Sequence, residues 1–344
     1  MGVKNLRFLL FPFAVIYGAV MRARNFLFDK SFFTSRSSTL PSIGVGNLST
    51  GGTGKSVVVD YLIQHFKEQY AVAVLSRGYG RKTRGLLLAD ERSTALTLGD
   101  EPFQFYKKHP EIKVLVAEKR RVGMNFLEQQ KNPPRLVLLD DVMQHRWVLP
   151  RVLILTTAYD ALYSNDQIVP WGNLRESKAG ARRATLILVT KCPPNLSIDA
   201  QKKIQKQLKL GVHQLLFFTH IAYAHHLTNT LKKVPLMEWK KSSFVLVTGI
   251  AQPKPLLQHL ESLGLQFKHL EFPDHHNFTM RGIERIKQES GTAPIVTTEK
   301  DFGRLIPYFD PDKIFYLPIE LAFSSKSEEQ QFLDFVEEKV NKDL

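Results

Sequence analysis

One stretch near the N-terminus of the chain reads Ser49-Thr50-Gly51-Gly52-Thr53-Gly54-Lys55-Ser56. It follows an apolar run at residues 42–46, which predicts a strand, and it leads into a helical pattern that begins at Gly54. Glycines between a strand and a helix let backbone N–H groups surround a phosphate, and the helix N-terminus adds positive potential. The sequence therefore predicts a nucleotide-binding loop of the P-loop type at residues 49–56.

The residues of this loop have distinct expected roles. Lys55 is expected to reach the β- and γ-phosphates of ATP, and the hydroxyl of Ser56 is expected to ligate Mg²⁺. The strict pattern has glycine at the first loop position, where this chain has Ser49, so Gly51 and Gly52 supply the flexibility instead. A glycine-rich turn that binds no nucleotide is the alternative interpretation.

Two carboxylates follow a second apolar run. Residues 135–140 predict a strand, which ends at Asp140 and Asp141. One carboxylate is enough to hold Mg²⁺ or its water shell, so the other is a candidate for orienting a further ligand. Alternatively, the pair caps the next helix.

Apolar runs rich in Val, Ile and Leu alternate with helical patterns along most of the chain. They predict strands at 42–46, 71–76, 113–117, 135–140 and 151–156, and a second set at 184–190, 215–219, 244–248, 267–272, 294–298 and 314–318. Helices are expected to begin at residue 54 and near residues 119, 199, 253 and 279, with a last one at 328–340. This order is typical of the α/β class, and predicts a doubly wound, mostly parallel sheet in each of two α/β/α domains.

The polar residues 160–180, which include Gly and Pro, predict the junction between the domains. We expect a membrane-associated N-terminal helix at 1–30, a P-loop nucleotide-binding domain at 31–159 and a second α/β domain at 160–304. The C-terminal segment, about residues 305–344, could pack back on the nucleotide-binding domain.

The chain is basic, with 47 Lys and Arg against 33 Asp and Glu and a net charge of +14. This excess favours an acidic partner: nucleic acid, an anionic membrane surface or a phosphorylated substrate. The basic residues are spread along the chain, without a zinc motif or an aromatic-basic RNA signature, so we do not expect nucleic-acid binding. The single cysteine, Cys192, excludes an internal disulfide and a cysteine-based zinc site, and it fits a reducing compartment.

An apolar segment with basic flanks opens the chain. Residues 6–21 read LRFLLFPFAVIYGAVM, and Arg22 and Arg24 follow directly. The segment is shorter than the roughly 20 apolar residues that a spanning helix needs, and no small-x-small cleavage site follows it. We expect a helix that lies in the headgroup region of an anionic membrane. A packed core helix, or a signal or spanning segment, is the alternative.

Three polar segments follow predicted strands, where the sites of α/β proteins lie. They are residues 76–81, 98–102 and 272–278. Each is a common kind of turn sequence when taken alone.

Together with the P-loop, these segments closely resemble the tetraacyldisaccharide 4'-kinase family of lipid A biosynthesis. The resemblance runs from about residue 44 to residue 301. The matching stretches, in order, are Gly44-Val45-Gly46-Asn47-Leu48, Gly51-Gly52-Thr53-Gly54-Lys55, Ser76-Arg77-Gly78-Tyr79-Gly80, Gly99-Asp100-Glu101-Pro102, Asp140-Asp141 with Gln144-His145, Leu174-Arg175-Glu176, Phe272-Pro273-Asp274-His275-His276 and Thr298-Glu299-Lys300-Asp301. The chain departs from the family pattern at Val142, at 169–173 and at 118–120.

The resemblance implies transfer of the γ-phosphoryl group of ATP to the 4'-hydroxyl of a tetraacyldisaccharide 1-phosphate, which gives lipid IVA. It implies a general base at Asp100, oriented by His275, with His276 the less favoured choice. Lys55 and Arg77 are expected to offset charge on the phosphoryl oxygens. The Mg²⁺ side is expected to comprise Ser56, Asp140, Asp141 and Glu176.

The same resemblance implies a peripheral enzyme on the cytoplasmic face of the bacterial inner membrane, with a lipid substrate and no obligate protein partner. Two other classes of nucleotide-binding protein share parts of this pattern. A membrane-associated switch ATPase would carry a second lysine just before the glycine pair, where this chain has Thr50. A guanine-nucleotide protein would carry a base-reading aspartate, and the segment Val189-Thr190-Lys191-Cys192 lacks it.

Overall fold

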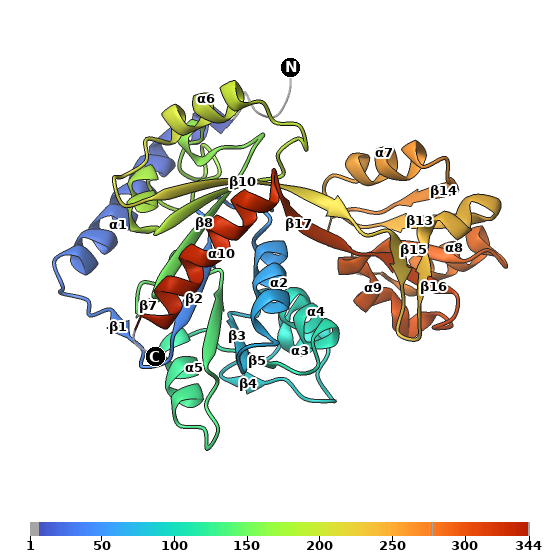
Figure 1. Ribbon diagram of the computed structural model, residues 1–344, viewed down its shortest axis with the longest axis horizontal. Helices are drawn as coiled ribbons and strands as arrows, with labels where there is room; N and C mark the ends of the chain where they lie inside the picture. Colours follow the sequence, from blue (N-terminus) through green and yellow to red (C-terminus); the bar gives the residue numbers. More distant parts are fainter. Residues whose placement is uncertain (1–6, 275, 277, 343–344) are drawn as a thin grey trace.

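The computed structural model describes residues 7–274, 276 and 278–342, and it forms two α/β units, each built on its own sheet (Figure 1). The first sheet has nine strands, in the order β17-β10-β9-β8-β2-β6-β3-β5-β4. Its central strands are parallel, while the edge strands β4 and β17 are antiparallel to their neighbours. The strands are β2 (Ser42–Gly46), β3 (Val72–Ser76), β4 (Leu87–Leu88), β5 (Lys113–Val116), β6 (Leu136–Asp140), β8 (Val152–Ala158), β9 (Leu186–Thr190), β10 (Leu215–Tyr223) and β17 (Ile319–Phe323).

The second sheet has six strands, in the order β12-β11-β16-β15-β13-β14. Two antiparallel strands, β10 and β17, lead from the first unit to this sheet and back, because β10 precedes β11 and β16 precedes β17 (Figure 1). The strands of the second sheet are β11 (His226–Thr228), β12 (Lys233–Pro235), β13 (Ser243–Thr248), β14 (Gln266–Glu271), β15 (Ile295–Thr298) and β16 (Ile314–Leu317). A separate parallel pair joins β1 (Arg36–Ser37) to β7 (Val148–Leu149).

Helices cover both faces of each sheet. In the first unit, α2 and α10 supply one apolar cluster, and α5 and α6 supply the clusters on the other face. In the second unit, α7 lies on one face and α8 and α9 lie on the other. The helices are α1 (Phe11–Asp29), α2 (Lys55–Phe66), α3 (Ala95–Leu98), α4 (Asp100–Lys108), α5 (Arg120–Glu128), α6 (Ile198–Leu208), α7 (Lys254–Ser262), α8 (Met280–Ser290), α9 (Glu299–Leu305) and α10 (Lys326–Asn341).

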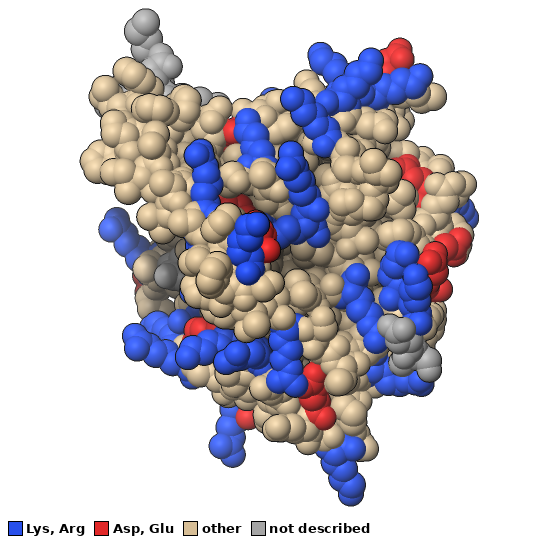
Figure 2. Space-filling view, turned by 90° about the vertical axis from the view of Figure 1, so that its left-hand side faces the viewer, with Lys and Arg blue, Asp and Glu red and all other residues tan. Residues whose placement is uncertain are grey.

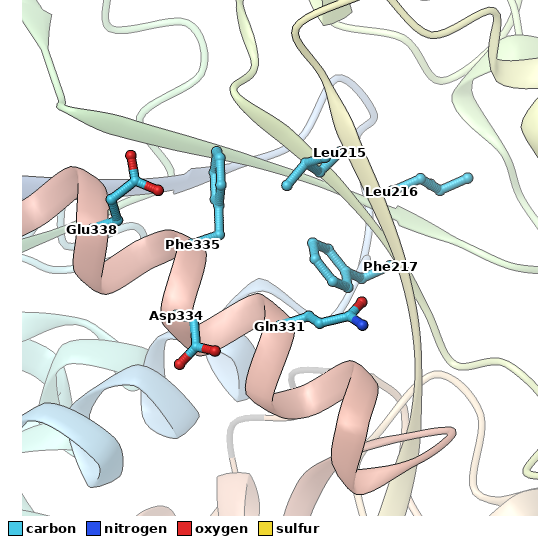
Figure 3. Close-up of a pocket in the computed structure, with 7 residues that line it drawn as sticks. All are labelled: Leu215, Leu216, Phe217, Gln331, Asp334, Phe335 and Glu338. Atoms are coloured by element: carbon cyan, nitrogen blue, oxygen red, sulfur yellow. The ribbon is translucent and has the colours of Figure 1, made fainter.

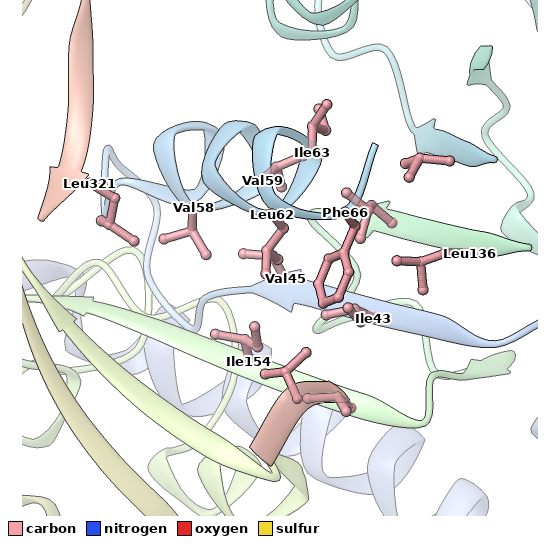
Figure 4. Close-up of a cluster of buried hydrophobic side chains, with 14 of the residues drawn as sticks. Ile43, Val45, Val58, Val59, Leu62, Ile63, Phe66, Leu136, Ile154 and Leu321 are labelled. Carbon is pink, nitrogen blue, oxygen red and sulfur yellow. The ribbon is translucent and has the colours of Figure 1, made fainter. Parts of the chain in front are cut away.

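The P-loop helix α2 is fixed by its apolar stripe. Val58, Val59, Leu62, Ile63 and Phe66 repeat at helical spacing and are fully buried. They pack on β2 and β6, as the labelled side chains of Figure 4 illustrate, and the same apolar cluster includes side chains of the C-terminal helix α10. The start of α2, where the phosphate loop lies, is therefore held rigidly against the sheet.

Every strand predicted from the sequence is present within a few residues of its expected bounds, so the predicted α/β class is confirmed. The division between the sheets differs from the expected junction at residues 160–180, because β9 and β10 belong to the first sheet and the second sheet begins only at His226. Part of residues 160–180 contacts the P-loop instead of linking the two units, since Leu174 bridges to Ser49 and the N–H of Thr50 donates to the carbonyl of Asn173 at 2.6 Å. The C-terminal helix α10 packs on the first sheet.

The N-terminal helix α1 has two unlike faces. One face lies on the first unit, where Ala14, Gly18 and Phe28 are buried. The other exposes apolar side chains, among them Phe13, Ile16 and Val20, which are each more than half exposed. Within the described residues, no helix is both long and apolar enough to cross a membrane.

Candidate active site

The carboxyl ends of neighbouring parallel strands place the predicted site residues of the first unit close together. The P-loop follows β2, Arg77 follows β3, and Asp140 and Asp141 end β6. Because β6 lies between β2 and β3, the two aspartates stand between the P-loop and Arg77. This is the edge of a doubly wound sheet at which ligands bind.

The P-loop is shaped by glycine and held from one side. Gly54, directly before α2, has a φ of 79°, a conformation that favours glycine. The last residue of β9 and the residue after it fix the loop from outside, since Thr190 Oγ1 donates to the Thr53 carbonyl at 2.8 Å and Lys191 Nζ donates to the Gly52 carbonyl at 2.6 Å. Thr190 and Lys191, which lie in a segment that lacks the aspartate of a base-reading motif, therefore support the loop.

Lys55 stands among acceptors at the start of α2. Its Nζ lies 3.3 Å from Asn47 Oδ1 and 3.5 Å from Asp141 Oδ1. Arg175 donates to both carboxylate oxygens of Asp141, at 2.9 and 2.8 Å. Burial alone would raise the pKa of Asp141, but the hydrogen bonds from Arg175 and the charge of Lys55 lower it well below its usual value. Asp141 is thus kept ionised beside the lysine.

Asp140 occupies a different environment one residue earlier. Its side chain is buried and accepts a hydrogen bond from Ser76 Oγ at 2.8 Å. Burial and the nearby charges of Glu101 and Asp141 raise the pKa of Asp140 to about 6. Three carboxylates therefore lie near one another, those of Glu101, Asp140 and Asp141. Carboxylate oxygens are the ligands that Mg²⁺ prefers.

Ser56 brings a further acid into this group. Its Oγ donates to Glu101 Oε1 at 3.1 Å. In the sequence Glu101 stood out only as part of a motif, and the clue that could have singled it out is its place beside Asp100. The two acids do not follow a strand: they open α4, directly after α3. Within the part of the chain that the structure describes, no three His, Cys, Asp or Glu side chains converge closely enough to hold a metal ion by themselves. The carboxylates near Ser56 could therefore hold Mg²⁺ only together with phosphate oxygens of a bound nucleotide.

Glu176 borders this group of residues, because Gln144 donates both to its carboxylate and to the carbonyl of Asn47. It is 1% exposed, and both its oxygens accept hydrogen bonds from Arg183 at 2.8 Å. Asn25 of α1 donates to it at 2.9 Å and Gln144 at 3.0 Å. In this structure the carboxylate joins α1 to the body of the first unit, so it is already surrounded by donors.

Asp100 begins α4, at the side of the first unit that faces the second one. Both its carboxylate oxygens accept hydrogen bonds from Arg304 of α9, with Nε at 3.1 Å from Oδ1 and Nη2 against Oδ2. The contact joins residues that are 204 positions apart and belong to different units. His275, the predicted partner of Asp100, lies outside the described residues. The alternative, His276, packs its ring against Phe272 and Phe278, and its carbonyl accepts from Arg304 Nη1 at 3.3 Å.

Arg77 is exposed just after β3 and contributes positive charge to this edge of the sheet. Together with burial, which is the larger cause, the charges of Arg120 and Arg77 lower the pKa of His145 to about 4. His145 is therefore neutral at physiological pH. The predicted charge-offsetting pair, Lys55 and Arg77, thus borders the aspartates from the two neighbouring strands.

A cavity of about 460 Å³ lies away from this edge. It is formed where α10 crosses the beginning of β10, with Phe217 and Phe335 pointing into it (Figure 3). The beginning of β10 is at the opposite end of the parallel sheet from the P-loop. The cavity is therefore separate from the candidate active site.

A family model, curated relatives and a solved structure all match nearly the whole length of this chain. The family model described as "LpxK: Tetraacyldisaccharide-1-P 4'-kinase" matches residues 6–340. A tetraacyldisaccharide 4'-kinase of Flavobacterium johnsoniae is 44% identical, over 97% of this chain and 98% of that protein. One of Bacteroides thetaiotaomicron is 40% identical, over 96% of this chain and 93% of that protein. The crystal structure of LpxK from Aquifex aeolicus in complex with ATP superposes with a TM-score of 0.78 at 27% identity, covering 96% of this chain and 99% of that one.

Proposed function

The chain belongs to the tetraacyldisaccharide-1-P 4'-kinase family, and from this premise we propose how its residues carry out the reaction. It is an ATP-dependent kinase that phosphorylates the 4'-hydroxyl of tetraacyldisaccharide 1-phosphate in lipid A biosynthesis. In the transfer, a bond forms between the 4'-oxygen and the γ-phosphorus, the bond from that phosphorus to the β–γ bridging oxygen breaks, and ADP leaves. One observation supports these roles most strongly: the P-loop and the aspartates at the end of β6 lie together at one edge of the first sheet.

The phosphate side of the site, which we define as the P-loop with Lys55, Ser56, Asp140 and Asp141, holds ATP. Backbone N–H groups of residues 49–56 surround the phosphates, and Lys55 neutralises charge on the β- and γ-phosphates. Mg²⁺ bound with ATP supplies further neutralisation of the developing charge. Ser56, Asp140 and Asp141 would hold it, and the contact between Ser56 and Glu101 supports adding Glu101 to this set.

Glu176 supports the site from outside in this proposal. Its two oxygens are engaged by Arg183, Asn25 and Gln144, so its carboxylate positions α1 and the segment after Asp141. Arg175, the preceding residue, donates to Asp141. The charge of Glu176 thus orients the metal-binding residues without itself reaching the metal.

The base side, which we define as Asp100 and His275, accepts the proton. A sugar hydroxyl is a poor nucleophile at neutral pH, so a carboxylate that takes its proton during the attack lowers the barrier. Asp100 takes this proton, and His275 orients the carboxylate. Arg77 and Lys55 offset the charge that builds up on the phosphoryl oxygens.

We further propose that the enzyme works at the cytoplasmic face of the inner membrane as a peripheral protein. Two features support this placement. The outer face of α1 exposes Phe13, Ile16 and Val20, which can enter the interfacial region of a bilayer. The side of the molecule that carries α1 also shows many Lys and Arg side chains and few acidic ones, which favours anionic lipid headgroups (Figure 2).

The experiment that tests the proposed roles measures transfer from ATP to tetraacyldisaccharide 1-phosphate in variants of the two sides. Asp141→Asn is expected to weaken both binding of Mg²⁺-ATP and turnover, whereas Asp100→Asn is expected to lower kcat and to leave ATP binding nearly unchanged. Equal effects of the two variants on ATP binding would contradict this division of roles.

A further inference from the structure

The two units meet through α4 of the first and α9 of the second. The helices approach closely, since a β-carbon on Gly303 of α9 would lie 3.5 Å from the ring of Phe103 on α4. Each end of this interface carries an ion pair. Arg304 contacts Asp100 at one end, and Lys108 contacts Glu299 at 2.9 Å at the other.

The two ion pairs make further contacts in different units: the Lys108 pair in the first unit and the Arg304 pair in the second. Lys108 also contacts Asp60 of α2 at 2.8 Å, and Asp60 contacts His109 at 2.7 Å, so this end is fastened to the helix that follows the P-loop. The Arg304 end is fastened to the second unit. Arg304 lies 3.9 Å from the fully buried Asp301, whose other oxygen accepts from the backbone N–H of Gly249 at 2.8 Å.

Arg304 contacts two places at once: the carboxylate of Asp100, the proposed base, and the backbone at His276. Its Nε and Nη2 donate to Asp100, and its Nη1 donates to the carbonyl of His276. A planar guanidinium that grips both carboxylate oxygens fixes the rotation of the carboxylate as well as its distance. The Arg304 side chain is 12% exposed, so water competes little for these hydrogen bonds.

This grip leaves the Asp100 carboxylate able to accept a further hydrogen bond. Each carboxylate oxygen can accept more than one hydrogen bond, and the Asp100 side chain is 29% exposed. An acceptor hydroxyl can therefore approach a carboxylate that Arg304 already orients.

We propose that Arg304 is a positioning residue for the kinase reaction, which sets the Asp100 carboxylate for proton transfer when the two units are together. The inference rests on the proposed role of Asp100 as the base. A lysine cannot replace the guanidinium fully, because it lacks the planar fork that reaches both oxygens.

The test compares kcat and the KM for ATP in full-length Arg304→Gln, Arg304→Lys and Glu299→Gln, with a thermal melt of each variant. Arg304→Gln should lower kcat by about 10- to 100-fold, because misplacing a catalytic group by about 1 Å costs on this order. Arg304→Lys should lose less, and its melting temperature should stay near that of the parent. Glu299→Gln breaks the charge pair at the other end of the same interface, and it should keep kcat within about threefold.

A double variant separates positioning from general support of the interface. If Arg304 acts through Asp100, Asp100→Asn with Arg304→Gln should be no slower than Asp100→Asn alone, since the unit is already disabled. A near-normal kcat in both Arg304 variants, equal losses in Glu299→Gln, or multiplicative losses in the double variant would overturn the proposal. If Asp100→Asn itself turns over normally, the base assignment fails, which distinguishes that failure from failure of the Arg304 inference alone. If Arg304→Gln does not fold, Arg304→Lys and its double variant with Asp100→Asn decide the question by the same criteria.

Discussion

The phosphate side and the base side of the site are built in different ways. Lys55, Asp140 and Asp141 are held within the first unit, by one sheet and by hydrogen bonds from Ser76 and Arg175. Asp100 instead meets a residue of the second unit, Arg304. On the proposed roles, nucleotide binding needs the first unit alone, whereas proton transfer needs both units together.

This difference has a physical reason. Phosphate charge has to be neutralised throughout the reaction, so a rigid, permanently charged pocket serves it well. The base is needed only during transfer, and a base that is completed by the other unit can be out of position until the units close. The following predictions test this contrast, from the largest expected effect to the smallest.

Removing the charge of the phosphate side should have the largest effect. Lys55→Ala should abolish transfer or lower it by about 10³-fold or more, because the variant loses the charge that grips the β- and γ-phosphates. The melting temperature should change little. Lys67→Ala, just past the other end of the same helix and paired on the surface with Glu111, is the matched control and should retain activity. Near-normal transfer by Lys55→Ala would refute the assignment of the ATP site.

Changes on the base side should slow turnover without loosening ATP. Asp100→Asn and His275→Ala should each lower kcat by about 10²–10⁴-fold, the range of general base catalysis, while the Kd for ATP stays within a few fold. The double variant should be little worse than the poorer single one if the residues act as a unit.

The following outcome would contradict a catalytic role for Asp100 and His275. Both variants would melt early, and their activity would follow the folded fraction. In that case Asp100 would act as the first residue of α4 and nothing more.

Glu176 should behave as a support residue. Glu176→Ala leaves Arg183 without its buried carboxylate, so it should destabilise the fold by on the order of 2–4 kcal/mol, reduced from the fully buried case because Arg183 is 20% exposed. A denaturant titration measures this loss. Turnover per folded molecule should fall far less than in Asp141→Asn. A stable Glu176→Ala protein with a weakened apparent affinity for Mg²⁺ would restore Glu176 to the metal side.

Membrane association should depend on the exposed face of α1. Replacing Phe13, Ile16 and Val20 by serine should reduce binding to anionic vesicles, because it removes apolar surface that would enter the bilayer. Ile198→Ser, an equally exposed apolar position on α6, is the control. High salt should weaken the electrostatic part of binding in both proteins. Unchanged sedimentation of the triple variant with vesicles would contradict the proposed anchor.

Much of this architecture could be predicted from the sequence, because buried parallel strands such as Leu136–Asp140 read as continuous apolar runs. The P-loop and the strand-end aspartates could also be predicted, since they are local patterns. Short elements such as Leu87–Leu88 and His226–Thr228 could not, because two or three residues carry no periodicity.

Contacts between residues far apart in the sequence could not be predicted either. The Asp100–Arg304 pair joins residues 204 positions apart, and the Ser56–Glu101 contact joins two predicted motifs whose relative placement depends on tertiary packing. The burial of Glu176 against Arg183 and α1 is a further case, since a Leu-Arg-Glu stretch gives no sign of which donors will surround its carboxylate.

The central claim is that this kinase holds ATP with one unit and completes the base with the other. The most direct measurement compares Asp100→Asn with the parent enzyme in two assays: equilibrium binding of Mg²⁺-ATP, and transfer of a radiolabelled γ-phosphoryl group to tetraacyldisaccharide 1-phosphate. We predict that the parent enzyme labels the 4' position, and that the variant binds ATP as the parent does but transfers the label about 10²-fold more slowly or worse. Transfer at the parental rate, or loss of ATP binding in parallel with loss of transfer, would contradict the claim.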